Sequence, residues 1–315
     1  LTLEDVLNIY EKENPVGVIV QFGGQTPLNL ALALKKEGVK ILGTTPENID
    51  LAEDRNKFKE ILDRLGLKQP KNAIVYSEEE SIEEAKRVGY PVVVRPSYVL
   101  GGASMEICYS EEELTKYIVQ AKEINPEHPI LLDKFLDNAI ELDVDAVANE
   151  QKCVIAGIME HVEPCGIHSG DSVCVLPTFS ISSKMIEEIR RATYALAKEL
   201  NVVGLMNIQF AIQDDTLYMI EVNPRGSRTV PFVSKATNVQ WAKMATRIML
   251  GKSFDELGIK EDIDNKLWSV KESVLPFNKF TDTDPVLSPE MKSTGEVMGI
   301  DQDINIAYYK AQMAA

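Results

Sequence analysis

Residues 219–225 read Met-Ile-Glu-Val-Asn-Pro-Arg. The alternation of apolar and polar residues is typical of a β-strand, and the run ends in a carboxylate, an amide and a guanidinium. Glu221 and Asn223 are two residues apart, so in a strand both side chains point to the same face of the sheet. The run therefore predicts a strand that carries two oxygen donors on one face, with Arg225 directly after it.

A second strand-like run, residues 205–212, precedes this one and contains Gln209. Asp214-Asp215 lies between the two runs and indicates a hairpin turn. If residues 214–216 form the loop, Gln209 lies opposite Glu221. Three oxygen donors then gather beside an arginine, a set that suits Mg²⁺ and leaves room for phosphate oxygens and water. The alternative is an ordinary hairpin with a polar outer face, which is common, and spacing alone does not separate the two.

Longer stretches of the sequence resemble one family of ligases. Residues 220–225 resemble the metal-binding strand of ATP-grasp ligases, and residues 221–237 are similar to the large chain of carbamoyl-phosphate synthetases, more narrowly to its second, C-terminal synthetase half. The similarity continues in further blocks over nearly the whole chain: residues 94–102, 159–163, 166–172, 269–272, 275–280 and 293–299. A match of this length is far more specific than a short motif. It implies an α/β (α+β) ATP-grasp fold preceded by a truncated Rossmann-like pre-ATP-grasp unit.

The composition agrees with a globular protein and excludes several other classes. The chain has 315 residues, 44% hydrophobic content and a net charge of −16. The acidic balance, without a clustered Lys/Arg stripe, disfavours nucleic acid as a partner, and no apolar run is long enough to span a membrane. The chain starts at Leu1 rather than Met, so we expect a fragment of a longer polypeptide. The cysteines form no C-x-x-C pair, and we expect reduced, buried thiols at Cys108, Cys153, Cys165 and Cys174.

Four segments are expected: a truncated pre-ATP-grasp unit over residues 1–50, an N-lobe with a glycine flap over 51–133, a C-lobe with the metal site over 134–250, and a connecting region toward a regulatory domain over 251–315. In the first segment, the apolar run 16–22 predicts a buried strand. Thr26 and Pro27 predict the start of a helix that ends at Gly38. The Gly23-Gly24 turn before it lacks the G-x-G-x-x-G fingerprint, so a tight turn is favoured over a phosphate site.

Capping residues indicate several helix boundaries further along the chain. Asp54 begins a helix that ends near Gly66, and Ser77 opens a helix that Gly89 closes. Residues 182–200 have the pattern of an amphipathic helix that packs on a sheet.

A nine-residue loop with two glycines, residues 96–104, joins two predicted strands. A hairpin does not need this length. We interpret the loop as a mobile flap over nucleotide phosphates, with backbone freedom from Gly101 and Gly102 and with Arg95 at its base. The alternative is a plain surface loop.

The family resemblance assigns roles to individual residues. Three oxygen donors match ligands for one or two Mg²⁺ or Mn²⁺ ions: Gln209, Glu221 and Asn223. Three arginines match residues that contact an ATP phosphate, the transferred phosphoryl group or the acceptor, and are candidate catalytic residues: Arg95, Arg225 and Arg228. Further positions match residues that contact ATP: Gly101, Gly102, Lys134, Leu136, Glu141, Gly166, Ile167, His168 and Ser169. We expect adenine against the linker 132–136, with Lys134 acting through its backbone, and the ribose hydroxyls at Glu141.

Other acidic residues and histidines receive separate interpretations. Asp143 and Asp145 alternate with apolar residues in a predicted strand, and we expect them on a solvated face. His128 is expected at the surface, and no third nitrogen or thiolate ligand occurs at zinc spacing. The resemblance implies a site for a monovalent cation, K⁺, and for allosteric amines near four residues: His161, Glu163, Asp171 and Ser172.

The resemblance implies that the chain is an ATP-dependent ligase. The expected reaction is the phosphorylation of carbamate by ATP to carbamoyl phosphate and ADP, which requires no activated protein nucleophile. The implied partners are a glutamine amidotransferase small subunit and the N-terminal half of the same large chain, in cytoplasmic arginine and pyrimidine biosynthesis. One alternative is a non-catalytic ATP-grasp module that senses nucleotide or serves as a scaffold, which predicts loss of metal ligands or of the phosphate arginine. Another is a different ATP-grasp carboxylate ligase, such as a biotin-dependent carboxylase.

Overall fold

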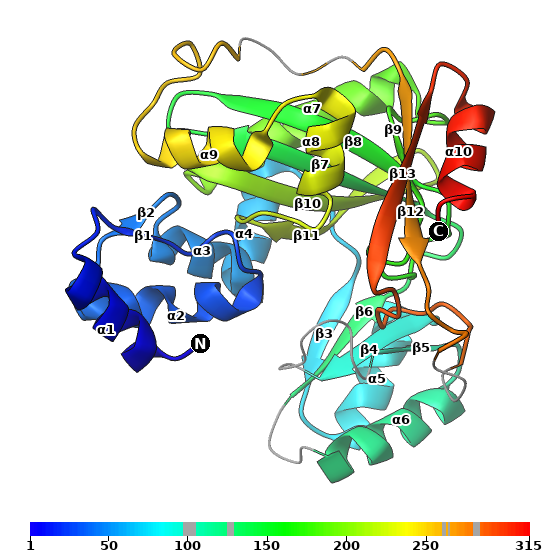
Figure 1. Ribbon diagram of the computed structural model, residues 1–315. Helices are drawn as coiled ribbons and strands as arrows, with labels where there is room; N and C mark the ends of the chain where they lie inside the picture. The colour runs from blue at the N-terminus through cyan, green and yellow to red at the C-terminus, as the bar shows by residue number, and fades with distance from the viewer. Residues whose placement is uncertain (97–104, 125–128, 260–262, 264, 280–283) are drawn as a thin grey trace.

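The computed structural model describes residues 1–96, 105–124, 129–259, 263, 265–279 and 284–315. These residues form three β-sheets of two, four and seven strands, with helices packed around them (Figure 1). In Figure 1 the seven-stranded sheet lies at the top, the first unit (dark blue) lies below it on one side, and the four-stranded sheet lies below it on the other. None of the described helices combines the length and the apolar character that a membrane crossing requires.

The first unit has two parallel strands and three helices: β1 (Val18–Ile19), β2 (Ile41–Leu42), α1 (Leu3–Glu13), α2 (Gln25–Lys36) and α3 (Pro46–Glu53). The start of α2 differs from the prediction. Gly24 is its N-cap, with φ +68°, a conformation that glycine adopts at little steric cost. Thr26 therefore lies inside the first turn, and its predicted capping role is wrong.

The four-stranded sheet is antiparallel, in the order β3-β6-β4-β5. Its strands are β3 (Asn72–Val75), β4 (Val92–Pro96), β5 (Glu106–Cys108) and β6 (Ile130–Lys134). Helices α5 (Glu78–Val88) and α6 (Glu111–Ile124) bury one face of this sheet. The predicted flap, with Gly101 and Gly102, and His128 lie outside the described residues.

Helix α4 (Arg55–Leu65) packs on the large sheet through Phe58, Ile61 and Leu62 rather than on the small sheet. Its predicted caps are confirmed. The Asp54 side chain accepts the N–H groups of the first turn, and Gly66 ends the helix with φ +67°.

The large sheet is antiparallel throughout, in the order β11-β10-β7-β8-β9-β12-β13. Its strands are β7 (Ile140–Ala148), β8 (Cys153–His161), β9 (Cys174–Leu176), β10 (Gly204–Gln213), β11 (Thr216–Asn223), β12 (Trp268–Val274) and β13 (Gly295–Asp301). The last two strands come from residues 251–315, so part of the segment expected to be a connector is built into this sheet. Helix α10 (Ile304–Gln312) packs beside them.

The two faces of the large sheet differ in character. Helix α7 (Ser183–Glu199) covers one face, where alternate residues of β7 and β10 join a large apolar core. Helices α8 (Val230–Thr237) and α9 (Trp241–Met249) cover part of the other face around Leu205 and Val147. The rest of that second face carries polar side chains, and the candidate site lies there.

Candidate metal and nucleotide site

The hairpin of β10 and β11 brings Gln209 directly opposite Glu221, as predicted, but by a different route. Its turn contains only Asp214 and Asp215, both with positive φ (50° and 54°), as the tight hairpin turns require. A two-residue turn alone would pair Gln209 with Ile220. A register shift beside Gln209 absorbs Ile220 as a bulge and restores the pair. The predicted three-residue loop is therefore wrong, whereas the predicted pairing is confirmed.

The bulge also decides which face of the sheet receives the oxygen donors. Before it, Leu217 and Met219 point into the α7 core, and after it Val222 does so. Because side chains alternate along a strand, Glu221 and Asn223 point to the opposite face. On this second face, Glu221 is exposed and Asn223 is partly buried.

Two cross-strand rows of polar residues run over this face. Asp143, Gln209 and Glu221 form one row, and Asp145, Asn207 and Asn223 form the other: Asp143 and Asp145 stand on β7, Gln209 and Asn207 on β10, Glu221 and Asn223 on β11. Paired residues of antiparallel strands share a face. The structure therefore gathers the three predicted metal ligands and adds three polar residues to them.

The expectation that Asp143 and Asp145 are solvated is wrong. Their residues are only 2% and 1% exposed, and the Asn207 amide donates to both carboxylates at 3.0 Å. His161 Nε2 lies 2.9 Å from Asp143 Oδ2. Burial favours the neutral form of Asp143, but the hydrogen bonds from His161 and Asn207 outweigh it and hold its pKa below the usual range. Covering by neighbouring strands and loops, which a strand pattern cannot show, explains the error.

Asp145 anchors the loop that carries the candidate arginines. Its Oδ1 accepts the Ser227 hydroxyl at 2.7 Å, and its Oδ2 accepts the Thr229 hydroxyl at 2.6 Å. Burial raises the pKa of Asp145 to about 6, although these hydroxyls act in the opposite direction. The loop after β11 is thus fixed to the sheet beside the oxygen donors.

Arg225 lies on this loop and contacts a predicted metal ligand. Its Nη2 donates to Asn223 Oδ1 at 2.9 Å, and its Nη1 donates to Gly226 O at 3.2 Å. Burial lowers the pKa of Arg225, whereas the charge of Glu221 favours the cation. Arg228 Nη1 contacts Met291 Sδ instead. The structure therefore joins Arg225 to the oxygen donors more closely than Arg228.

Arg95 approaches the same donors from the small sheet, at the end of β4. Its Nε lies 3.8 Å from Asp133 Oδ2, and Arg55 binds that carboxylate through both nitrogens of its fork, at 3.2 and 2.9 Å. Burial and the nearby Arg55 lower the pKa of Arg95, while Asp133 and Glu221 raise it. The sequence did not single out Arg55, because a polar residue at the start of a helix has the pattern of a surface position.

In the linker between the sheets, Lys134 is hydrogen-bonded to other parts of the protein. The N–H of Lys134 donates to Lys71 O at 2.7 Å, and its Nζ donates to Tyr90 O at 2.7 Å. This N–H is therefore hydrogen-bonded within the protein, and the expected role of the Lys134 backbone toward adenine stays a prediction. Leu136 is buried in a small apolar cluster with Ala139 and Ala211.

Glu141 and the loop 166–169 meet beside this linker. Glu141 is buried on β7, and burial raises its pKa against the opposing effects of His161 and of the Gly166 N–H. Gly166 has φ +101°, and a Cβ there would lie 2.6 Å from the Phe135 ring. This position requires glycine, since both the backbone conformation and the close approach exclude a side chain.

The remaining loop residues, 167–169, are partly buried. Burial and the charge of Arg228 lower the pKa of His168, and Glu221 acts in the other direction. His168 Nδ1 accepts the Gly170 N–H at 2.9 Å. Ile167 is partly buried, and Ser169 O accepts Lys271 Nζ at 3.2 Å. The loop is thus held partly by β12.

The predicted cation and amine residues are largely engaged in other contacts. Asp171 accepts the N–H groups of Lys292 and Ser293 at 2.7 and 2.9 Å. Glu163 accepts the Val173 N–H at 2.6 Å, and Ser172 Oγ donates to His168 O at 3.4 Å. Within the described part of the chain, no three His, Cys, Asp or Glu side chains gather as a metal site.

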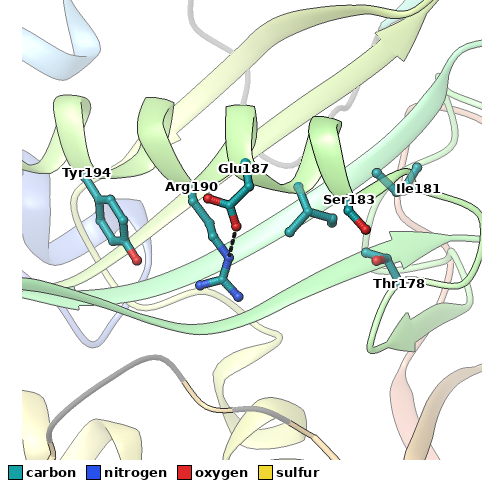
Figure 2. Close-up of a pocket in the computed structure, with 7 residues that line it drawn as sticks. Thr178, Ile181, Ser183, Glu187, Arg190 and Tyr194 are labelled. Atoms are coloured by element: carbon teal, nitrogen blue, oxygen red, sulfur yellow. Dashed lines mark ion pairs between the residues drawn. The ribbon is translucent and has the colours of Figure 1, made fainter.

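A surface groove elsewhere on the molecule includes none of these residues. Figure 2 shows it along the outer side of α7, lined by Thr178, Ile181, Ser183, Ile186, Glu187, Arg190 and Tyr194. Glu187 and Arg190, one turn apart on α7, form an ion pair of 3.7 Å there. The groove belongs to the α7 side of the sheet, so we do not assign it to the site.

A large antiparallel sheet bearing oxygen donors, with a small sheet that presents an arginine to them, defines the ATP-grasp class. Two family models cover most of the chain. The model described as carbamoyl-phosphate synthase L chain, ATP binding domain, matches residues 54–257, and the one described as carbamoyl phosphate synthase preATP-grasp domain matches residues 1–51. The chain therefore belongs to the carbamoyl-phosphate synthase L chain family.

Curated relatives agree with this assignment. The carbamoyl phosphate synthase large chain of Archaeoglobus fulgidus is 58% identical over 315 residues, covering 100% of this chain and 29% of that protein. The C-terminal section of the large chain of Methanocaldococcus jannaschii is 52% identical, covering 100% of this chain and 53% of that protein. The chain thus spans between 29% and 53% of the length of these relatives.

Solved structures share the fold at low sequence identity. The biotin carboxylase domain of the 2-oxoglutarate carboxylase of Hydrogenobacter thermophilus, in complex with MgADP, has a TM-score of 0.74 at 21% identity and covers 88% of this chain and 63% of that chain. Biotin carboxylase of Campylobacter jejuni has a TM-score of 0.73 at 16% identity and covers 87% of this chain and 63% of that chain. Identities this low indicate a common fold and carry no information on the substrate.

The donor set itself fits a hard divalent cation. Gln209, Glu221 and Asn223 offer one carboxylate and two amide oxygens on one face of one hairpin. Such a set supplies part of an octahedral shell and leaves positions for phosphate oxygens and water. Because the hairpin has regular pairing on both sides of the bulge, the geometry of the donors is fixed by backbone hydrogen bonds.

Proposed function

We propose that this chain phosphorylates carbamate with ATP, giving carbamoyl phosphate and ADP, as the C-terminal synthetase unit of a glutamine-hydrolysing carbamoyl-phosphate synthase. The pairing of Gln209 with Glu221, with Asn223 on the same face, is the observation that carries the proposal. Membership of the carbamoyl-phosphate synthase L chain family supports the proposal, including carbamate as the acceptor.

The three oxygen donors would hold Mg²⁺ or Mn²⁺ against the triphosphate. Held there, the ion would neutralise the negative charge that develops on the phosphate oxygens. Asn223 is oriented for this role by Arg225, whose Nη2 donates to its amide oxygen. The MgADP complex of the biotin carboxylase domain supports a magnesium nucleotide as the ligand of this fold.

Two arginines from opposite lobes would stabilise the transferring phosphoryl group. Arg95 comes from the small sheet and Arg225 from the loop after β11, and the charge of Glu221 acts on both. A carbamate oxygen attacks the γ-phosphorus, the bond to the bridging oxygen breaks, and ADP leaves with that electron pair. The acceptor is already anionic, so the protein has to position and shield charge rather than remove a proton.

The remaining parts of the reaction are assigned to other polypeptide segments. An amidotransferase small subunit would supply ammonia, and an N-terminal sister half would make carbamate. The coverage of 29% of the Archaeoglobus large chain supports a longer polypeptide around this unit. We further propose that K⁺ binds near His161, Glu163, Asp171 and Ser172. The protein would then be a cytoplasmic enzyme of arginine and pyrimidine biosynthesis.

The test measures the phosphoryl-transfer reaction in both directions with the complete protein. With ATP, Mg²⁺ and carbamate, ADP should form in proportion to carbamate, and with ADP and carbamoyl phosphate, ATP should form. ATP binding without either reaction would favour a non-catalytic nucleotide-sensing module. ADP formation that depends on another carboxylate, with no use of carbamoyl phosphate, would point to a different ligase.

A further inference from the structure

We propose that Gln21, a buried residue of the first unit, is a positioning residue that holds Arg225 and the metal-bearing hairpin in their working geometry. The inference rests on the proposed function, because Arg225 and the hairpin are the groups which that function uses. It gives the first unit a part in phosphoryl transfer, although its glycine turn has no dinucleotide fingerprint.

Gln21 forms hydrogen bonds with the chain on both sides of Arg225. Its side chain is fully buried, and its Nε2 donates to Pro224 O at 2.7 Å. Its own carbonyl accepts the Gly226 N–H at 2.9 Å. Gly226 O in turn accepts Arg225 Nη1 at 3.2 Å. A shift of Gln21 would therefore move the backbone before and after the arginine, together with one of its hydrogen-bond partners.

Thr44 connects Gln21 through hydrogen bonds to the other strand of the hairpin. Gln21 Nε2 donates to Thr44 Oγ1 at 3.1 Å, and Gln21 Oε1 accepts the Thr44 N–H at 3.1 Å. Thr44 Oγ1 donates to Val203 O at 3.2 Å and accepts the Val203 N–H at 3.0 Å. Val203 directly precedes β10, so the two residues clamp the start of β10 and the end of β11.

The local structure of the first unit is built for this clamp. Gly43 has φ +102°, and a Cβ there would lie 2.1 Å from Gln21 Oε1. Glycine thus lets the amide approach the backbone closely. Both Nε2 hydrogens and the amide oxygen of Gln21 have partners in a fully buried site, so replacement by an apolar residue would leave Thr44 N–H and Pro224 O unpaired.

The test compares Gln21→Met with Val39→Ala in the complete protein. Methionine keeps the approximate length and removes the polar clamp. Val39 lies in the core of the same unit, so its truncation lowers stability without touching the hairpin. We expect Gln21→Met to reduce kcat for ATP formation from carbamoyl phosphate by about 10²-fold, since small misplacements of catalytic groups have effects of this size, while KM for ADP stays near its original value. Val39→Ala should retain kcat.

Hydrogen exchange supplies a readout that does not require activity. The amides of residues 225–229 should exchange faster in Gln21→Met than in wild type or Val39→Ala. Equal kcat in Gln21→Met and wild type, or an equal loss in Val39→Ala, would overturn the inference. If the wild type itself lacks the reaction, the proposed function fails, and unchanged amide exchange of residues 225–229 would then reject the clamp separately.

A second pair of variants keeps the inference testable if Gln21→Met does not fold. Thr44→Val removes the hydroxyl at nearly constant shape, and Thr44→Ser keeps it. We expect Thr44→Val to lower kcat and to speed amide exchange at residues 203–205 and 225–226, and Thr44→Ser to recover most of the lost kcat. Similar behaviour of the two variants would mean that the hydroxyl does not position the hairpin.

Discussion

Gln209 on β10 faces Glu221 on β11 because a bulge at Ile220 corrects the register of a two-residue turn. Without the bulge, Glu221 would alternate into the α7 core, and an isolated carboxylate there would be very costly. One extra residue in β11 therefore decides whether the Glu221 carboxylate points into the apolar core or toward the face that carries the oxygen donors.

Glu221→Gln should weaken divalent-metal binding. The substitution keeps an oxygen donor but removes the only negative charge among the three predicted ligands, so the attraction for the ion falls. We expect the affinity for Mn²⁺ in the presence of ATP, measured by electron paramagnetic resonance, to drop at least about tenfold, a change of about 1.4 kcal/mol. Glu187→Gln on the outer side of α7 is the matched control and should bind Mn²⁺ normally. Equal affinities in the two variants would remove Glu221 from the metal set.

Arg95→Lys and Arg225→Lys should lower the rate more than they weaken nucleotide binding. Lysine keeps the charge but loses the planar fork that contacts two acceptors. Loss of a positioned charge-stabilising donor costs on the order of 10²–10³ in kcat. The control is Arg64→Lys, at an exposed ion pair with Glu199. Kinetics in ATP should show a reduced kcat with a smaller change in KM, and an unchanged kcat at both positions would exclude the arginines from the transition state.

Asp145 should make the protein less stable as the pH rises from about 4 to about 6. Burial raises its pKa to about 6 from an ordinary value of 3.8, so the folded protein binds a proton that the unfolded chain has released. Stability from this group is full below pH 4 and is lost as pH passes 6, by up to about 3 kcal/mol.

Asp145→Asn removes this titration and provides the measurement. The free energy of unfolding in urea should show a deficit relative to wild type that shrinks between pH 4 and pH 7. Asp255→Asn, at an exposed position, should keep the wild-type slope. A deficit of Asp145→Asn that is constant over this range would contradict the raised pKa.

Gly166→Ala should raise KM for ATP. The added Cβ would meet the Phe135 ring at 2.6 Å and displace the loop from the linker. Gly38→Ala is the control, because Gly38 also has a positive φ (+81°) but no neighbouring atom within 4 Å of its Cβ position. Both variants carry backbone strain of about 1–2 kcal/mol. In steady-state kinetics, KM for ATP should therefore rise in Gly166→Ala and stay near the wild-type value in Gly38→Ala. An equal change of KM in both variants would mean that backbone strain alone is responsible.

Residue patterns within short segments of the sequence predicted the helices and strands whose boundaries depend on neighbouring residues. The Asp54 and Ser77 caps, the antiparallel pairing of the strands on both sides of the flap segment, and the amphipathic helix after Ser182 are confirmed. The caps depend on residues within three positions of one another, and the two paired strands are neighbours in the sequence. The long match to the large chain of carbamoyl-phosphate synthetases predicted the family and the ATP-grasp fold.

Contacts between distant segments could not be predicted in this way. The burial of Asp143 depends on Asn207 and His161, which come from other strands. The Lys134 N–H is occupied by Lys71, and Gln21 reaches Pro224 across 203 positions of sequence. Such pairings depend on the packing of whole sheets, and spacing within one strand contains no trace of them. The ATP-contacting roles of Lys134, Leu136, Glu141 and the loop 166–169 stay predictions.

The transfer of phosphate from carbamoyl phosphate to ADP by wild type and by Glu221→Ala tests the central claim most directly. The account predicts Mg²⁺-dependent ATP formation in the wild type and none above background in Glu221→Ala, with Glu187→Ala active as the control. ATP formation by Glu221→Ala at a near-normal rate, with the same Mg²⁺ dependence, would contradict the assignment of phosphoryl transfer to this hairpin.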